Sequence, residues 1–235
     1  GYYLETAAST ASAINVADGT VTATADRLVI RNAKGEDVTD KLNISRINGS
    51  IKINPAALNV VTNGDEKVYD GTALTAGGSV SGYIGTETAT FSTTGSQTAV
   101  GESTNSYSLV FDQSAIESNY TVSTDLGTLK VKEYAGEITV TTTGGEFTYD
   151  GQAHGATVSV SALPAGYTLD TATSSASVTD VNETAATATC DTLVILNAQG
   201  DDVTAKLNIR KTDGSIKVNK AVLTVVTPGG EKVYD

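Results

Sequence analysis

Residues 26–53 read DRLVIRNAKGEDVTDKLNISRINGSIKI, and residues 191–218 read DTLVILNAQGDDVTAKLNIRKTDGSIKV. The two stretches belong to a longer duplication, because residues 1–70 align with residues 166–235 without a gap, and 42 of the 70 aligned pairs are identical. A segment copied at a fixed offset is the signature of a repeat architecture, in which one folded unit recurs along the chain. The repeat is therefore the first feature that a fold has to explain.

A shorter period lies inside the duplication. Tyr69-Asp70-Gly71 returns as Tyr149-Asp150-Gly151 and again as Tyr234-Asp235, and a diverged copy of the 41–53 phrase occupies residues 119–131. The pattern predicts four segments: a partial B-type module at 1–53 that lacks its first strands, an A-type module at 54–132, a B-type module at 133–218, and the first strand of a further A-type module at 219–235. A fragment of a longer array would have this arrangement.

The residue types favour an all-β fold. Threonine, valine, isoleucine and tyrosine are frequent, and they suit a pleated, half-buried surface. Short alternating runs between Gly, Asn and Asp turns predict tandem immunoglobulin-like β-sandwich modules of about 80 residues in an elongated array. Asn48-Gly49 and Asp213-Gly214 predict type I′ hairpin turns between the strands at 42–44 and 51–53 and between those at 207–209 and 216–218. The continuously apolar runs Leu28–Ile30 and Leu193–Leu196 predict central strands.

Charge and composition exclude several classes of function. The net charge of −12 argues against a nucleic-acid partner, which requires a basic surface. No apolar run is long enough for a membrane span. Cys190 is the single cysteine and His154 the single histidine, so a disulfide framework is excluded and zinc or histidine-base chemistry has little to work with. We therefore expect no enzyme activity, no catalytic or metal site and no cofactor.

Two chemical alternatives stay open. The acidic turns Gly35-Glu36-Asp37 and Gly200-Asp201-Asp202 could hold Ca²⁺ weakly, although neither has EF-hand spacing. Lys41 or Lys206 could form an isopeptide bond with a nearby asparagine, and the mass of the intact chain would then be lower by one ammonia per bond.

The Tyr-Asp-Gly phrases predict structural turns. Glycine takes the positive φ of a tight turn, aspartate accepts hydrogen bonds from backbone N–H groups two residues on, and tyrosine buries its ring with its hydroxyl directed at a backbone carbonyl. The predicted turn-and-anchor residues are Tyr69, Asp70, Gly71, Tyr149, Asp150 and Gly151. The candidate ligand contacts, chosen as exposed-looking aromatic residues, are Tyr2, Tyr3, Tyr83 and Tyr107.

Four phrases carry a resemblance to a known repeat type. They are residues 66–72, residues 94–101, Asn119-Tyr120 followed by 127–131, and residues 147–151 leading to 163–167. They resemble the Tyr-Asp-Gly immunoglobulin-like repeats, close to those called MBG, of large surface proteins of Gram-positive gut bacteria. The resemblance implies an extracellular, cell-wall-attached parent protein in which these modules form a stalk that projects a binding domain. The alternative is an adhesin module that binds a host glycan, mucin or host protein directly.

The incomplete modules carry their own expectation. Residues 1–53 lack the counterparts of 133–165, whereas residues 221–226 form an apolar strand without an evident partner. Because an open strand edge invites pairing, we expect residues 219–235 either to pack beside the 133–218 module or to complete the first module of a neighbouring molecule by strand exchange. Neighbouring repeats of the same chain are the other expected partners.

Overall fold

The structure, a computed structural model, describes every residue from Gly1 to Asp235. The fold is all-β, with many short strands in several small sheets, and its helical elements are single 3-10 turns. The structure contains no helix with the length and apolar character that a membrane span requires. The chain divides into two compact units, which are Gly1–Asp65 with Thr75–Ser96 and Glu102–Leu129, and Glu66–Leu74 with Gln97–Gly101 and Lys130–Asp235.

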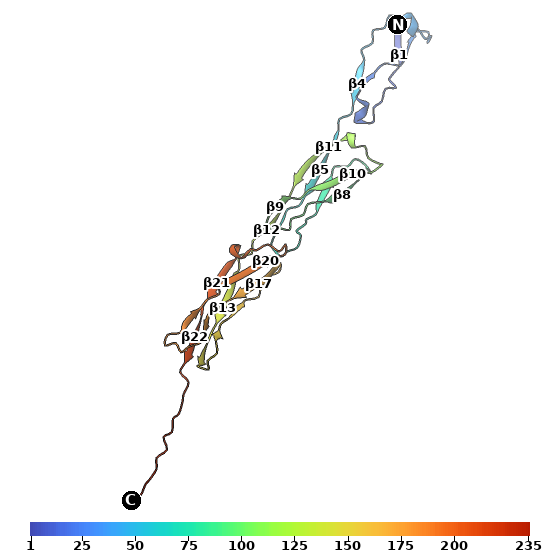
Figure 1. Cartoon of the computed structure of the whole chain (residues 1–235). Helices are drawn as coiled ribbons and strands as arrows, with labels where there is room; N and C mark the ends of the chain where they lie inside the picture. The colour runs from blue at the N-terminus through green and yellow to red at the C-terminus, as the bar shows by residue number, and fades with distance from the viewer. The chain divides into compact units, whose positions relative to one another are not determined.

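The first unit contains four sheets and three 3-10 turns. Sheets β1-β3 and β2-β4 come from residues 1–53, and sheets β10-β8 and β11-β5-β7 from later residues (Figure 1). Their strands are β1 (Tyr2–Ala8), β2 (Thr20–Ala23), β3 (Arg27–Asn32), β4 (Gly49–Lys52), β5 (Ala56–Thr62), β7 (Gly78–Ser81), β8 (Ala89–Thr93), β10 (Tyr107–Phe111) and β11 (Tyr120–Leu126). The 3-10 turns are η1 (Val16–Asp18), η2 (Thr39–Lys41) and η3 (Glu117–Asn119).

The second unit is built from sheets β16-β13-β21, β14-β22-β19, β15-β18 and β17-β20. Their strands are β13 (Glu137–Thr143), β14 (Gly145–Thr148), β15 (His154–Gly155), β16 (Thr157–Val160), β17 (Tyr167–Thr173), β18 (Ser177–Val178), β19 (Ala186–Ala188), β20 (Thr192–Asn197), β21 (Asn208–Thr212) and β22 (Gly214–Asn219), with one 3-10 turn, η4 (Thr204–Lys206). Strands β6 (Asp65–Val68), β9 (Gly101–Thr104) and β12 (Thr128–Lys132) form a further sheet in the order β6-β12-β9.

The sequence duplication is also a duplication of strand register. Tyr2 lies opposite Asn32 in β1-β3, and its counterpart Tyr167 lies opposite Asn197 in β17-β20. Both pairs carry a register shift at the same place, between Leu4 and Thr6 and between Leu169 and Thr171. Identical patterns of apolar and polar side chains therefore select identical pairings.

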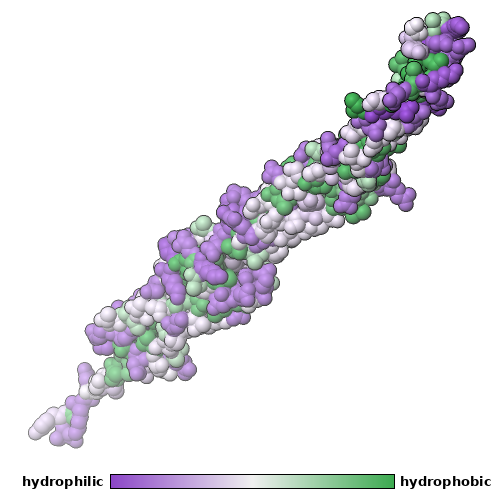
Figure 2. Space-filling view, turned by 90° about the horizontal axis from the view of Figure 1, so that it is seen from above, coloured by the Kyte–Doolittle hydropathy of each residue, from purple (hydrophilic) through white to green (hydrophobic).

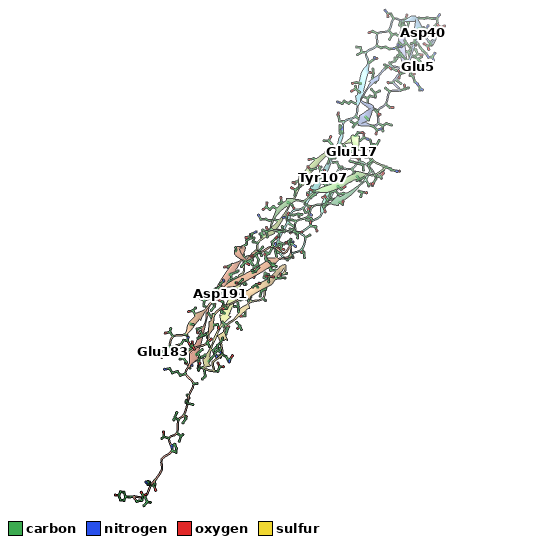
Figure 3. All side chains as sticks on the ribbon, viewed as in Figure 1. Glu5, Asp40, Tyr107, Glu117, Glu183 and Asp191 are labelled. Carbon is green, nitrogen blue, oxygen red and sulfur yellow. The ribbon has the colours of Figure 1, made fainter.

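Side-chain hydrogen bonds repeat with the register. Asp26 accepts a hydrogen bond from the Thr10 backbone N–H at 2.9 Å, and its counterpart Asp191, labelled in Figure 3, accepts one from Ser175 N–H at 2.7 Å. The Ile195 N–H donates to Thr204 Oγ1 at 2.8 Å, as Ile30 does to Thr39. The shared loops of the two copies therefore close with the same capping bonds.

The predicted hairpins at Asn48-Gly49 and Asp213-Gly214 are wrong. No residue other than glycine has a positive φ, so neither pair forms a type I′ turn. Strands β21 and β22 instead lie in different sheets: β21 pairs in parallel with β13, and β22 pairs in parallel with β14. Residues 42–44 form no strand at all.

Glycines at Gly127, Gly144 and Gly214 allow two neighbouring strands to pass together from one sheet to another. In the second unit, Gly144 separates β13 from β14, and a Cβ added at Gly214 would lie 2.5 Å from Thr142 O. In the first unit, a Cβ at Gly127 would lie 2.2 Å from Asn63 C and from Gly64 N. The two backbones thus approach too closely for any side chain, which explains the glycine without a turn.

Alternating strands build the buried core beside these crossings. Leu58, Val60 and Thr62 point inward from β5, as Ile138, Val140 and Thr142 do from β13. Such alternation is expected for strands with one buried face.

Asn105, which is fully buried, ties the first unit together at the crossing. Its side-chain Nδ2 donates to Asn63 O and Ala76 O, both at 3.0 Å, and its backbone carbonyl oxygen accepts from Thr62 Oγ1 at 2.7 Å. One buried amide therefore satisfies carbonyl groups that would otherwise lack partners.

The predicted central strands are wrong in one respect. Residues 28–30 and 193–196 form β3 and β20, but each pairs with a single strand, β1 or β17. Ile195 is nevertheless fully buried, because β20 is covered by packing rather than by strands on both edges, whereas its counterpart Ile30 is only half-buried. Residues 1–53 contain no counterpart of β13 or β14, and residues 43–47, the counterparts of β21, form no strand.

The expectation that residues 219–235 pack beside the 133–218 module is wrong for residues 220–235. These residues form no strand, as the ribbon without arrows in Figure 1 also shows, and all of them are exposed to solvent. The edge of β22 is already occupied on both sides by β14 and β19, so it has no place for a further strand.

The Gly127 crossing predicts a specific sensitivity. We expect Gly127→Ala to lower the free energy of unfolding by about 1–3 kcal/mol, because the new methyl group would overlap backbone atoms of residues 63 and 64. Urea denaturation followed by circular dichroism measures the change. Gly77→Ala is the matched control, because a Cβ there meets no atom within 4 Å. Equal urea midpoints for the two variants would contradict the close backbone approach at Gly127.

Candidate functional site

The two Tyr-Asp-Gly turns have the backbone geometry that the sequence predicts. Gly71 and Gly151 have φ values of 81° and 78°. Asp70 Oδ1 accepts a hydrogen bond from the Thr72 N–H, and Asp150 Oδ1 accepts one from the Gln152 N–H, both at 2.9 Å. The tripeptide therefore specifies a local turn, and the neighbours of each turn decide what it binds.

Tyr69, in the second unit, is an anchor with only 4% of its surface exposed. Its ring meets the ring of Tyr167 edge-on, with centroids 5.2 Å apart, a favourable aromatic geometry. Its hydroxyl accepts a hydrogen bond from Ala198 N–H at 3.0 Å and donates one to Gln199 Oε1 at 2.7 Å. The hydroxyl thus binds a backbone N–H and a side-chain amide, rather than the backbone carbonyl that we expected.

Two glycine backbones meet beside this anchor. A Cβ at Gly166 would lie 2.4 Å from Asp70 C, and a Cβ at Gly71 would lie 3.1 Å from Gly166 Cα. Both glycines have positive φ. The Tyr69 ring can reach the 197–200 turn because neither backbone carries a side chain at this point.

An ion pair stabilises the turn that contains Tyr69, Asp70 and Gly71. Lys67 Nζ donates to Asp70 Oδ1 and to Thr72 O, both at 2.7 Å. The Lys67 hydrogen bond, followed by the bonds from the Thr72 N–H and hydroxyl, lowers the pKa of Asp70 to about 2. Asp70 is therefore ionised throughout the physiological range and acts as a hydrogen-bond acceptor.

The second turn differs from the expectation, because Tyr149 is 43% exposed rather than buried. Its backbone N–H donates to Asn219 O, but its ring has no aromatic partner in the second unit. His154 lies close by, 3.1 Å from Asp150 Oδ1 and stacked on Phe147 with centroids 4.1 Å apart. The hydrogen bond from the Gln152 N–H is the main reason that the pKa of Asp150 is lowered.

A small cavity adjoins Tyr69 and Tyr167. Its volume is about 180 Å³, and its polar lining includes Glu133, Gln199, Asp201 and Lys206. Sites for drug-sized ligands usually enclose about 300–1,000 Å³. The cavity is therefore too small for an oligosaccharide, although water molecules fit in it.

The candidate ligand tyrosines do not share one surface. Tyr2 and Tyr3 are exposed neighbours on β1, and neighbouring residues on a strand point to opposite faces. Tyr83 is half-buried against Tyr120, and Tyr107, labelled in Figure 3, is half-buried against Phe91 on the β8-β10 pair. Exposed apolar residues are scattered, and Figure 2 shows hydrophilic and hydrophobic residues interspersed on the visible face of each unit.

In the acidic turns at 35–37 and 200–202, an aspartate carboxylate accepts hydrogen bonds from residues of the same loop. Asp37 accepts from the Thr39 N–H at 3.0 Å, and Asp202 accepts from the Thr204 N–H at 2.9 Å. No three His, Cys, Asp or Glu side chains are grouped so that they could hold a metal ion. Lys41 and Lys206 are both exposed, so they lack the buried surroundings that promote an isopeptide bond.

Sequence reasoning did not identify the 197–200 turn as the partner of the Tyr69 hydroxyl. The Ala198-Gln199 backbone is held by Asn197, whose Oδ1 accepts from the Gln199 and Asp201 N–H groups at 3.0 and 2.9 Å. The repeated phrase Asn-Ala-x-Gly, at 32–35 and at 197–200, was the available signal. Nothing in that phrase, however, states which distant side chain it receives.

No family model, curated protein or solved structure matches the chain. The functional argument therefore depends on the geometry of the molecule and on the motifs in its sequence.

The hydroxyl of Tyr69 provides one test. We expect Tyr69→Phe to lower stability by about 1 kcal/mol, because it removes two part-buried hydrogen bonds, from the Ala198 N–H and to the Gln199 side chain. Hydrogen exchange by NMR should show faster exchange of the Ala198 amide. Tyr149→Phe is the control, because that side chain is exposed. An unchanged Ala198 exchange rate would refute the role of the hydroxyl.

Asp70 provides a test by pH. Its pKa is lowered from 3.8 to about 2 in the folded chain, so ionised Asp70 stabilises the fold above pH 4, and this contribution is lost as the pH falls towards 2. Asp70→Asn should flatten the loss of stability in this window, measured by thermal unfolding at a series of pH values. Asp180→Asn, an exposed change in the same unit, should leave the profile unaltered. Parallel profiles for wild type and Asp70→Asn would rule out the effect.

Proposed function

We propose that this chain is a structural stalk or spacer of a bacterial cell-surface protein, built from tandem immunoglobulin-like β-sandwich modules that project a binding domain away from the cell wall. In this proposal the parent protein is extracellular and cell-wall attached, and the repeats have no catalytic role. The motif resemblance to Tyr-Asp-Gly repeats suggests the setting. The argument for a load-bearing role comes from strand pairing.

The observation that carries the proposal is the parallel pairing of the strands at the beginning and end of a repeat. In residues 133–218, the opening strands β13 and β14 pair in parallel with the closing strands β21 and β22. In residues 54–132, β5 pairs in parallel with β11, from Ala56 opposite Tyr120 to Thr62 opposite Leu126. A pull applied through the chain draws such strands in opposite directions along their length.

This geometry favours resistance to tension. When parallel terminal strands are drawn apart lengthwise, all hydrogen bonds of the ladder are loaded together, whereas an antiparallel hairpin opened from one end loses them one pair at a time. Forced unfolding depends on the unfolding barrier, so simultaneous loading raises the rupture force. A module that transmits force between a cell wall and a binding domain needs this property.

The surface supports a spacer more than a direct binding module. The cavity near Tyr69 is too small for a glycan, and two larger hollows, of about 460 and 470 Å³, are lined by no aromatic side chain on which a sugar could stack. The four candidate tyrosines are distributed over different strands and faces. The net charge of −12 keeps such a surface soluble at high local density. No particular observation favours the adhesin alternative.

Single-molecule force spectroscopy tests the proposal. The Cys190→Ser chain is pulled either through its two ends or through cysteines introduced at Ser92 and Ser108, which lie opposite each other in the antiparallel β8-β10 pair. We expect a clearly higher rupture force for pulling through the ends, since that direction loads the β5-β11 ladder lengthwise. Equal rupture forces in the two pulling directions would contradict the load-bearing role.

Solution scattering provides an independent check on the spacer proposal. Consecutive strands such as β13 and β14 span residues 137–148, roughly 40 Å at about 3.3 Å per residue, so modules in a row should give a maximum dimension on the order of 100 Å. A compact particle would contradict a spacer, whatever the rupture force.

A further inference from the structure

Residues 220–235 expose an apolar side-chain pattern to solvent. Leu223 is 85% exposed, and Val222, Val225, Val226 and Val233 are similarly open. None of these residues lies in a strand. We refer to residues 222–233 as the donor segment.

The donor segment repeats the sequence of β13 and β14. At an offset of 85 positions, Leu223 and Val225 correspond to Ile138 and Val140, both buried in the core of the second unit. Thr227 likewise corresponds to the buried Thr142. The glycine crossing is present too, because Gly229-Gly230-Glu231 corresponds to Gly144-Gly145-Glu146.

Residues 43–54 lack the partner that this segment would supply; we refer to them as the acceptor segment. Their counterparts in the second copy are β21 and β22, which pair in parallel with β13 and β14. In the first copy, residues 43–47 form no strand and β4 pairs only with β2. Ile47 is 97% exposed.

We propose that the donor segment of one copy of this chain pairs in parallel with the acceptor segment of a second copy. This inference concerns self-association and does not depend on the stalk function. The β13-β21 register places Leu223 opposite Ile44 and Thr224 opposite Ser45. The β14-β22 register places Glu231 opposite Lys52, a pair of opposite charges.

Pairing of the donor segment with the acceptor segment is more favourable than displacement of β5 from its sheet. The donor segment also resembles β5, but β5 is already held between β11 and β7, and replacing it would break two ladders. Pairing with residues 43–54 breaks no existing ladder. It also removes the apolar side chains of Leu223 and Val225 from water, which is favourable.

The short connection favours a second copy as the partner. Only Lys220 and Ala221 separate β22 from the donor segment, and two residues span at most about 7 Å. The acceptor must therefore lie directly beside the end of β22, a position open to another molecule. Because donor and acceptor are different surfaces, the association is head to tail, and it gives either a closed ring or an open chain of copies.

Sedimentation velocity over a range of concentrations tests the association. We expect the full chain to grow beyond its 24.0 kDa monomer mass as its concentration rises. Leu223→Asp with Val225→Asp should abolish this growth, because both side chains face the new core. Val222→Asp with Thr224→Asp is the matched control, with two new charges on the opposite face of the strand, and should retain it.

A disulfide crosslink tests the register. In the Cys190→Ser background, Ser45→Cys with Thr224→Cys should form intermolecular disulfides under mild oxidation, since neighbouring strands lie about 4.8 Å apart, within disulfide reach. Ser45→Cys with Val222→Cys, displaced by two residues, should crosslink much less. A chain that stays monomeric at every concentration, or crosslinks only within one molecule, would overturn the proposal.

Discussion

The structure depends on pairs of parallel strands that pass together from one sheet to another. Strands β13 and β21 run side by side in one sheet, and their continuations β14 and β22 run side by side in the next. The passage requires the two backbones to approach at Gly144 and Gly214, where a Cβ would overlap carbonyl atoms. Once this crossing is fixed, the inward positions of both strands follow from simple alternation.

The same constraint explains why two nearly identical segments differ in burial. Residues 1–53 and 166–218 share strand registers and capping hydrogen bonds, yet Ile51 is half-buried and its counterpart Ile216 fully buried. The difference lies in the parallel partner, because β14 covers the second copy and no equivalent strand covers the first. The local hydrogen bonds therefore form without the parallel partner strand, whereas full burial of the core residues requires that strand.

The Tyr-Asp-Gly turns make the same distinction between local and distant effects. Asp70 and Asp150 accept equivalent backbone hydrogen bonds, because residues within the turn supply them. Tyr69 is buried and Tyr149 is half-exposed, because only the first meets the 166–167 and 197–200 backbones. A repeated motif thus serves as an anchor where a complementary surface is present and remains an ordinary turn elsewhere.

The sequence by itself determined the all-β class, the strand positions of most alternating runs, the duplicated registers and the local turns, because all of these follow from side-chain period and from glycine φ over a few residues. It misled on Asn48-Gly49 and Asp213-Gly214, neither of which forms a hairpin turn. Gly214 is required by a close backbone approach, and the sequence does not distinguish such a glycine from a hairpin glycine. Only the tertiary structure decided which strands pair in parallel and where Tyr69 binds. Those contacts join residues far apart in the chain, and the sequence around one partner does not specify which distant residue it will meet.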